Sequence, residues 1–320
     1  MLNSLIKITK KKHLFPFYHL VENEIPVFIK HLYTPKNIKN FKSDLDTFLQ
    51  YFESISLSQT IATNIHSGSE KKASFHVTFD DGLSNFYHVI APILLEKKIH
   101  ATVFLNSDFI DNKDLFYRYK ASLLIEQYLN SDKEKQKKIE YFVLQHSKNT
   151  DVKNFLLQID YQNRALLDSL AHEINYSFTD YLNKHKPYLT SKQITELQKQ
   201  GFTFGSHSKS HPLYQKLSLF QQIYQTIEDL NELKKHQNIT YPVFAFPFYD
   251  TNISTDFFNA IQDKITLSFG TSGLKKDTVP WNLQRLDMEK NKGNTKLFLI
   301  KQYFKLFLQQ QTNKNNVKRS

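Results

Sequence analysis

The feature that most constrains the fold of this chain is a short alternating segment that ends in two adjacent carboxylates. In residues 74–80, SFHVTFD, every second side chain is a bulky apolar one. This is the pattern of a strand that buries one of its faces in a core. The strand ends at Asp80-Asp81-Gly82. The fold must therefore contain a buried strand whose carboxyl end delivers acidic side chains.

The residues that follow indicate that the neighbouring strand runs parallel to this one. Residues 85–98 have helical character, and HATVFLN at 100–106 is a second apolar strand. A strand, a helix and a strand at this spacing form a βαβ unit with parallel strands. Short strands alternate with helices again between residues 201 and 271, in FTFGSH, YPVFAFPF and ITLSFGT. We therefore expect a β/α barrel, in which functional side chains gather at the carboxyl ends of the strands.

The segments around these strands predict the domain organisation. Residues 112–200 are rich in Lys, Gln and Leu with helical periodicity, which indicates a helical insertion in the barrel and not an independent domain. We expect residues 1–72, which contain an amphipathic helix within 41–55, to be an N-terminal extension packing on the barrel. Residues 73–308 then form the main domain. The polar residues 309–320 are expected to be a disordered tail.

A second chemical signature follows the strand FTFG. His207 and His211 are separated by three residues, which matches the short spacing of metal-binding histidine pairs. Pro212 disfavours a helical conformation at His211, so we expect the pair on a loop. With one carboxylate of the Asp80-Asp81 pair, the histidines make a two-histidine, one-carboxylate set, which leaves coordination positions open for water and substrate. Zn is the leading candidate for a divalent metal, iron and cobalt are alternatives, and the other carboxylate stays free as a base.

Three segments, in this order, resemble the motifs of the NodB-homology polysaccharide deacetylases, carbohydrate esterase family 4. VTFDDG at 77–82 is similar to the first motif, GSHSKSHP at 205–212 to the second, and FAFPFYD at 244–250 to the third. FYHLVENE and NLQRLDME resemble the branch that includes poly-N-acetylglucosamine deacetylases. The resemblance implies a distorted (β/α)7 barrel with a helical insertion. It also implies a hydrolase that removes N-acetyl groups from an amino-sugar glycan or glycoconjugate.

The same resemblance implies roles for individual residues. Asp80 corresponds to the general base, and Asp81, His207 and His211 correspond to the metal ligands. Asp80 would take a proton from metal-bound water, which attacks the acetamide carbon while the metal stabilises the oxyanion. Arg285 is a candidate for orienting Asp80 or for binding substrate. The candidate substrate-binding residues are Phe246, Pro247, Phe248, Tyr249, Trp281 and Arg285.

The general acid that protonates the leaving amine has no clear candidate in the sequence. The family's late histidine motif is absent, and His236, the last histidine of the chain, fits a solvated helix end. His76 shares a strand face with Asp80 but also suits a hydrogen-bonded position in the core. His19, in FYHL, is a further candidate from the N-terminal segment that resembles the family.

Two other functions stay open. Tyr249 stands where the third motif usually has a glycine, a residue that permits turns with positive φ. This change and the missing late histidine favour a catalytically impaired module for carbohydrate binding or assembly. The other hypothesis is a metal-dependent hydrolase of a different carbon–nitrogen bond, on a small or lipid-linked substrate. The active deacetylase is preferred because the base and the metal ligands are complete.

Composition limits the partners. The net charge is +11, with lysine spread along the chain and arginine rare, which fits compositional bias. No basic cluster with interleaved aromatics suggests a nucleic-acid partner. The chain has no cysteine, and it has neither a signal peptide nor an apolar span of ~20 residues. We expect a cytoplasmic protein with a carbohydrate substrate, and the run from Lys7 to Lys12 leaves a peripheral membrane contact open.

Overall fold

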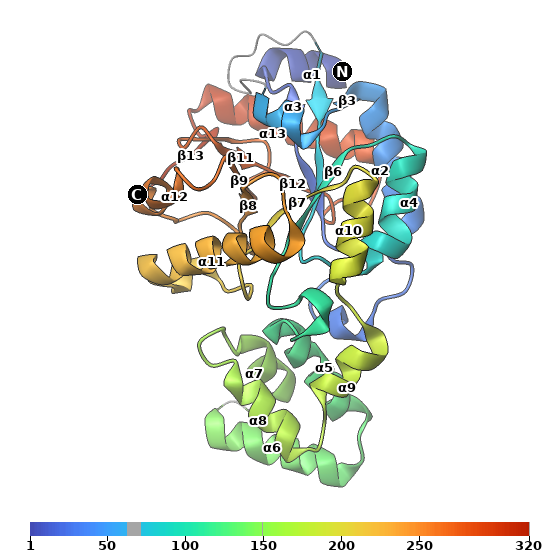
Figure 1. Cartoon of the computed structure of the whole chain (residues 1–320), viewed down its shortest axis with the longest axis vertical. Coiled ribbons are helices and arrows are strands. Elements are labelled where there is room, and N and C mark those ends of the chain that lie inside the picture. Colours follow the sequence, from blue (N-terminus) through green and yellow to red (C-terminus); the bar gives the residue numbers. More distant parts are fainter. Residues whose placement is uncertain (63–71, 149, 320) are drawn as a thin grey trace.

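The centre of the fold is a sheet of parallel strands, around which helices pack (Figure 1). The structure is a computed structural model, and it describes residues 1–62, 72–148 and 150–319. The strand order in the main sheet is β11-β9-β8-β7-β6-β5-β2-β12, and each neighbouring pair is parallel. These strands are β2 (Pro16–Tyr18), β5 (Val77–Phe79), β6 (Ala101–Leu105), β7 (Thr203–Ser206), β8 (Val243–Ala245), β9 (Leu267–Gly270), β11 (Asn282–Gln284) and β12 (Leu286–Asp287).

The first and last strands of this sheet are consecutive pieces of one segment, separated only by Arg285. β11 pairs with β9, while β12 pairs with β2. Between them, the N–H of Arg285 donates to the carbonyl of Gly270 (3.1 Å) and that of Leu286 to the carbonyl of Phe15 (2.8 Å). Residues 282–287 therefore join the two edges into a barrel. Counting β11 and β12 as one interrupted strand confirms the predicted distorted (β/α)7 barrel.

Helices cover the outside of the barrel, and two of them begin with a capping box. Ser218 and Gln221 form a capping box at the start of α11, as Thr190 and Gln193 do for α10. In the described part of the chain, no helix is both long and apolar enough to cross a membrane. These elements are α1 (Leu2–Thr9), α2 (Ile38–Tyr51), η2 (Phe86–Ile90), α4 (Ala91–Glu96), α10 (Ser191–Lys199), η4 (Tyr214–Lys216), α11 (Leu219–Gln237), α12 (Thr255–Ile261) and α13 (Thr295–Gln311).

The N-terminal segment contributes directly to the barrel. Its strand β2 lies between β5 and β12, with Phe17 and Tyr18 buried. β1 (His13–Leu14) and β3 (Glu53–Ser54) flank β4 (Ser74–Phe75) in a second small parallel sheet. We predicted that residues 1–72 only pack on the outside of the barrel. The described part of this segment also supplies β2, and the barrel is incomplete without that strand. The segment also includes η1 (Val27–Ile29) and α3 (Leu57–Ala62).

A helical lobe follows β6 and has a core of its own. Leu124, Val143, Leu156 and Leu167 are fully buried in it, and Figure 1 shows the lobe beyond the end of the barrel. The predicted insertion extended to about residue 200, but α10 packs on β7 and α11 of the barrel. The lobe therefore ends before α10. Its elements are η3 (Ile110–Asn112), α5 (Tyr117–Asn130), α6 (Lys133–His146), α7 (Val152–Gln158), α8 (Ala165–Glu173) and α9 (Phe178–His185).

The C-terminal residues differ from the disordered tail predicted for 309–320. α13 continues to Gln311, and β13 (Asn316–Val317) pairs in parallel with β10 (Lys276–Asp277). Arg319 then forms ion pairs with Asp250 and Asp277. Only a two-residue strand and one arginine hold this segment in place. Its polar composition therefore does not reveal that it is ordered.

Candidate functional site

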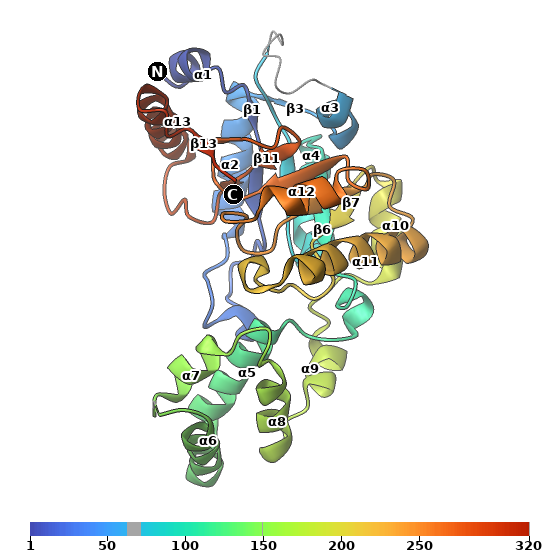
Figure 2. The ribbon, with the colours of Figure 1, turned by 90° about the vertical axis from the view of Figure 1, so that its left-hand side faces the viewer.

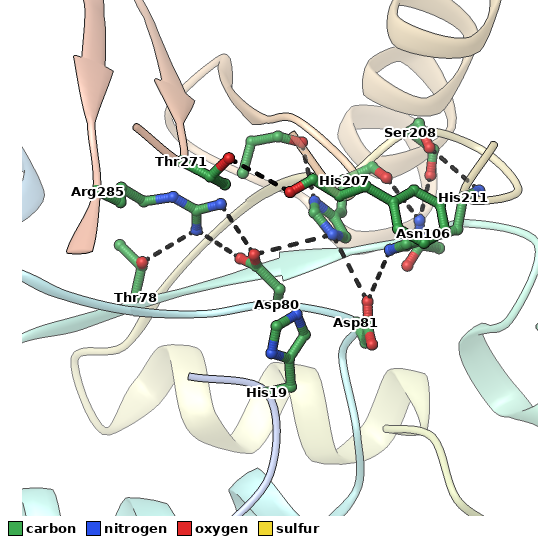
Figure 3. Close-up of polar contacts among 12 residues, drawn as sticks. His19, Thr78, Asp80, Asp81, Asn106, His207, Ser208, His211, Thr271 and Arg285 are labelled. Carbon is green, nitrogen blue, oxygen red and sulfur yellow. Dashed lines mark hydrogen bonds and ion pairs between the residues drawn. The ribbon is translucent and has the colours of Figure 1, made fainter. Parts of the chain in front are cut away.

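Asp81, His207 and His211 come together at the carboxyl ends of β5 and β7 (Figure 3). Their potential ligand atoms all lie within 4.8 Å of one another, and all three residues are buried. His211 Nε2 is 3.1 Å from Asp81 Oδ1, and His207 Nε2 is 3.6 Å from the same oxygen. Residues more than 120 positions apart in the sequence thus form one compact polar cluster.

Unusual backbone conformations turn these side chains toward one another. Asp81, Gly82 and His211 have φ values of 69°, 59° and 55°. The positive φ of Gly82 favours glycine at this position, and a Cβ there would lie 2.8 Å from Leu105 Cδ2 and displace that side chain. Asn106, just after β6, donates two hydrogen bonds to backbone carbonyls of the histidine loop. The turns and this amide position the cluster.

The ionisation of the cluster suits a cation. His207 Nδ1 is 2.8 Å from the carbonyl of Ala245, so Nδ1 carries the proton and Nε2 faces Asp81. Burial lowers the pKa of His207 to about 4, although Asp80 acts in the opposite direction. Burial raises the pKa of Asp81, but His211 outweighs this and holds it well below its usual range. A neutral imidazole and an ionised carboxylate are the ligand forms that metals require.

One buried oxygen indicates where a cation fits. Asp81 Oδ1 forms no hydrogen bond within the described residues, although it lies between the Nε2 atoms of two histidines. A buried polar atom without a partner is rare and needs an explanation. Asp81, His207 and His211 are three ligands of the types that bind Zn²⁺, in a number that leaves a position open. The residues present therefore fit a divalent metal.

Asp80 lies beside the cluster in a buried ion pair. Its two oxygens accept hydrogen bonds of 2.6 and 2.8 Å from the guanidinium of Arg285. Arg285 also donates to Thr78 Oγ1 at 3.1 Å and to the carbonyl of Gly270 at 3.2 Å. Burial raises the pKa of Asp80, but Arg285 outweighs it and the pKa is lowered. Asp80 is therefore ionised, and its Oδ2 lies 3.9 Å from His207 Nε2.

His19, which follows β2, lies beside Asp80 and Asp81 in Figure 3. Its Nδ1 is 2.8 Å from Glu289 Oε2, and the backbone N–H groups of His19 and Leu20 both donate to Glu289 Oε1. Burial lowers the pKa of His19, but the attraction of Glu289 outweighs it and raises the pKa to about 10. This histidine is therefore protonated at neutral pH.

The two other histidines considered from the sequence lie elsewhere. The ring nitrogens of His76 are each 2.8 Å from a partner, the carbonyl of Ile55 and Thr102 Oγ1. His76 precedes β5, so it lies toward the amino ends of the strands, and burial lowers its pKa to about 4. His236 is 54% exposed and lies 3.4 Å from Glu232 on the same helix. Of these candidates, the structure brings His19 alone to the cluster.

The predicted substrate-binding aromatics divide into two groups. Phe248 packs against His211 with ring centroids 4.9 Å apart, and it is Phe248, not Tyr249, that adopts a positive φ of 58°. Tyr249 is exposed. Phe246 is instead fully buried in the core, and Pro247 beside it is also buried. The chain bends at residues 247 and 248, which leaves Phe246 in the core and Phe248 beside His211, so Phe246 does not form the predicted groove wall.

Trp281 also lies away from the cluster. It precedes β11, packs at 5.5 Å on Phe258 and lines a cavity of about 460 Å³ with Pro242 and residues 262–266. Pro242 and Thr266 likewise precede β8 and β9. This cavity is therefore at the amino ends of the strands, opposite Asp81. The prediction that Trp281 contributes to substrate binding beside the metal ligands is not supported by its position.

Two contacts from the helical lobe complete the cluster, and the sequence did not point to either. Tyr119 Oη donates to Asp81 Oδ2 at 2.7 Å. The ring centroid of Phe116 lies 4.4 Å from that of His211. Neither residue belongs to a motif, and the helical periodicity around them indicates only a helix. The lobe therefore holds Asp81 by a hydrogen bond and covers His211 with an aromatic ring.

Known proteins match the chain at the level of family and fold. A family model described as polysaccharide deacetylase matches residues 67–263, whereas no curated protein matches the chain. Among solved structures, Streptococcus pyogenes deacetylase PplD in complex with acetate has a TM-score of 0.56 at 16% identity, covering 90% of this chain and 96% of that one. IcaB from Ammonifex degensii has a TM-score of 0.55 at 14% identity, with coverages of 91% and 97%. A de-N-acetylase from Aggregatibacter actinomycetemcomitans has a TM-score of 0.53 at 14% identity, with coverages of 90% and 99%.

Proposed function

Because the chain belongs to the polysaccharide deacetylase family and is a hydrolase of that type, we propose that it removes N-acetyl groups from an amino-sugar glycan or glycoconjugate. The observation that carries the proposal is the buried group of Asp81, His207 and His211 with the ionised Asp80 beside it. Catalytic groups of β/α barrels lie at the carboxyl ends of the strands, where these residues are found. The related fold of two proteins described as deacetylases supports the same chemistry.

In this proposal Asp81, His207 and His211 hold a divalent metal, with Zn²⁺ as the first choice. Nitrogen and carboxylate ligands suit Zn²⁺, and three protein ligands are typical of its catalytic sites. When bound, such an ion polarises the acetamide carbonyl and lowers the pKa of bound water toward about 7. Tyr119 fixes the rotation of the Asp81 carboxylate by donating to the oxygen that does not face the histidines.

Asp80 acts as the general base. Its Oδ2 lies 3.9 Å from His207 Nε2, so one water molecule near the histidine can also donate to Asp80. The proton of this water passes to Asp80, and its oxygen adds to the carbonyl carbon of the acetamide. Arg285 holds both oxygens of Asp80, which fixes the orientation of the carboxylate and keeps it ionised between turnovers.

His19 acts as the general acid. The carbon–nitrogen bond breaks as the sugar nitrogen takes a proton from His19, and the products are acetate and a free amine. Glu289 orients the ring through Nδ1, which leaves Nε2 to donate. A protonated histidine suits this role, and Glu289 raises the pKa of His19 to about 10 against the effect of burial.

The first test measures metal and acetate together. After equilibration with Zn²⁺ and gel filtration, the wild-type chain is expected to retain about one ion. Removing a hydrogen-bond partner of a metal ligand typically lowers the metal affinity about 10–100-fold. His211→Ala removes a ligand itself, so its affinity for Zn²⁺ is expected to fall by more than this. Metal content is measured by mass spectrometry, and acetate release is measured on N-acetylglucosamine oligomers. Both signals should fall together.

His236→Ala is the matched control, because it removes an exposed histidine that lies on α11. It should keep the metal and the activity of the wild type. A His211→Ala protein that binds Zn²⁺ normally would contradict the assignment of the ligands. A wild-type chain that binds Zn²⁺ but releases no acetate from any N-acetylated glycan would contradict the proposed reaction.

The second test concerns pH. Glu289→Gln is expected to move the alkaline limb of the kcat profile to lower pH. Glu289 raises the pKa of His19, so without its charge His19 loses its proton at a lower pH, and a general acid is active only while protonated. The amide oxygen of Gln can still accept from the N–H groups of His19 and Leu20, which preserves the local fold.

Glu232→Gln provides the control for this shift, since Glu232 pairs with the exposed His236 and is not among the carboxylates that act most strongly on the pKa of His19. The alkaline limb should not move in this variant. If Glu289→Gln also leaves the limb in place, His19 is not the group whose deprotonation limits the reaction.

A further inference from the structure

The net positive charge of the chain comes from its two ends. Residues 1–12 contain four lysines, residues 290–320 contain seven lysines and one arginine, and neither segment contains an acidic residue. The chain has 42 basic and 31 acidic side chains in total. Residues 13–289 therefore hold 30 basic and 31 acidic side chains and are close to neutral. A compositional bias alone does not concentrate the charge in this way.

The fold brings these two segments together. α1 and α13 pack side by side (Figure 2). Tyr303 Oη donates to the carbonyl of Lys11 at 3.0 Å, and Gln310 Nε2 donates to the carbonyl of Thr9 at 2.9 Å. Each helix buries one apolar side in the core, for example at Ile6 and Leu306. Their other sides face outward from the same part of the molecule.

The outward sides combine lysines with large apolar side chains. Leu297, Phe304 and Leu308 are 57%, 51% and 49% exposed, and their spacing of seven and four residues aligns them on one side of α13. Ile8 of α1 is 57% exposed. Lysines interrupt these apolar residues, and no carboxylate neutralises them from within either helix. We call this the terminal-helix face, formed by Ile8, Leu297, Lys301, Phe304, Lys305 and Leu308.

We propose that the terminal-helix face binds the surface of an anionic lipid bilayer. Basic helices with exposed Phe and Leu lie in the plane of such a surface, with the apolar side chains at the boundary between headgroups and acyl chains. Anionic headgroups attract lysines. Both features of the face thus have a partner in a bilayer, whereas a nucleic-acid backbone offers a partner for the lysines only.

The position of the face is compatible with catalysis. Figure 1 shows α1 and α13 at one end of the molecule and the helical lobe at the other. The lobe contacts the metal ligands through Tyr119, so the site lies on its side of the barrel. Binding of a bilayer at α1 and α13 leaves the site uncovered, and this inference does not depend on the proposed reaction.

The test is co-sedimentation of the full chain with vesicles. The wild type is expected to bind phosphatidylcholine vesicles that contain phosphatidylglycerol, and to bind pure phosphatidylcholine weakly or not at all. Lys301→Glu/Lys305→Glu is expected to lower the affinity for the mixed vesicles at least about tenfold. Raised salt should release the wild type, since it screens the headgroup charge. Phe304→Ser should weaken binding without removing its dependence on charge.

Lys133→Glu/Lys137→Glu is the matched control, because it makes the same change in net charge on the exposed side of α6. It should bind the mixed vesicles nearly as well as the wild type. An equal loss in both double variants, or equal binding of both vesicle types, would overturn the proposal. The proposal would also be overturned if the chain did not bind vesicles but instead bound RNA, or associated with itself, in a way that depends on Lys301 and Lys305.

Discussion

Replacing Asp80 by Asn is expected to lower kcat by about 10²–10⁴-fold, which is the usual contribution of a positioned general acid or base. The amide cannot accept the proton of the attacking water, yet it occupies the same volume beside His207. Asp81, His207 and His211 are unchanged, so the variant should still bind about one Zn²⁺ per chain. Acetate release under saturating substrate measures the loss, and mass spectrometry measures the metal.

The variant also disturbs an ion pair, and its control must account for this. Asp80 holds the buried Arg285 through two hydrogen bonds, so Asp80→Asn is expected to lower the melting temperature as well. Asp229→Asn removes another buried carboxylate, which accepts from the N–H of Ser107 and the hydroxyl of Ser206. It should lose stability but keep kcat below its melting temperature. A metal-loaded Asp80→Asn protein with normal kcat would remove Asp80 from the reaction.

The proposed metal ligands were predictable because each follows a recognisable strand. The alternation before Asp81 and the apolar run before His207 are local patterns, and the carboxyl ends of parallel strands meet at one end of a barrel. No long-range information is needed beyond that rule. The structure accordingly brings the three predicted ligands within 4.8 Å.

The position of His19 was harder to predict because β2 is only three residues long. Three residues are too few to show alternation, and the pairing of β2 with both β5 and β12 is a long-range property. Once β2 is known to be a strand of the barrel, His19 follows its carboxyl end as Asp81 follows β5. Glu289, just after β12, reaches the site by the same rule.

Tyr119 was not predictable from local pattern at all. Its helix is recognisable, but the contact with Asp81 exists only because the lobe docks against the end of the barrel. Helical periodicity reports which side of a helix is buried, not which residue of another element it meets. The third motif shows a similar limit, since the motif alone does not distinguish the core residue Phe246 from Phe248 beside His211.

Arg319→Ala is expected to lower the free energy of unfolding by about 3–5 kcal/mol, the usual result of removing one partner from a buried ion pair. The Arg319 side chain is 1% exposed and pairs with Asp250 and Asp277, whose side chains are equally buried. Asn282 and Gln284 also donate to both carboxylates. These amides carry no charge, so the variant leaves two buried anions without a cation.

The pH dependence of this loss has a definite sign. Burial raises the pKa of Asp250, but Arg319 outweighs it and the pKa is lowered. A lowered folded-state pKa gives stability that is present above the unfolded value of about 3.9 and is lost as the pH falls further. The difference between the wild type and Arg319→Ala should therefore be large at neutral pH and should shrink in acid.

Urea unfolding at neutral and acidic pH measures both expectations, with Arg164→Ala as the control. Arg164 is an exposed arginine that stacks on Tyr161, and its loss should change stability by no more than about 0.5 kcal/mol. Equal stability of Arg319→Ala and the wild type would mean that the C-terminal segment does not hold Asp250 and Asp277 in solution. A loss that grows as the pH falls would assign the effect to something other than these two carboxylates.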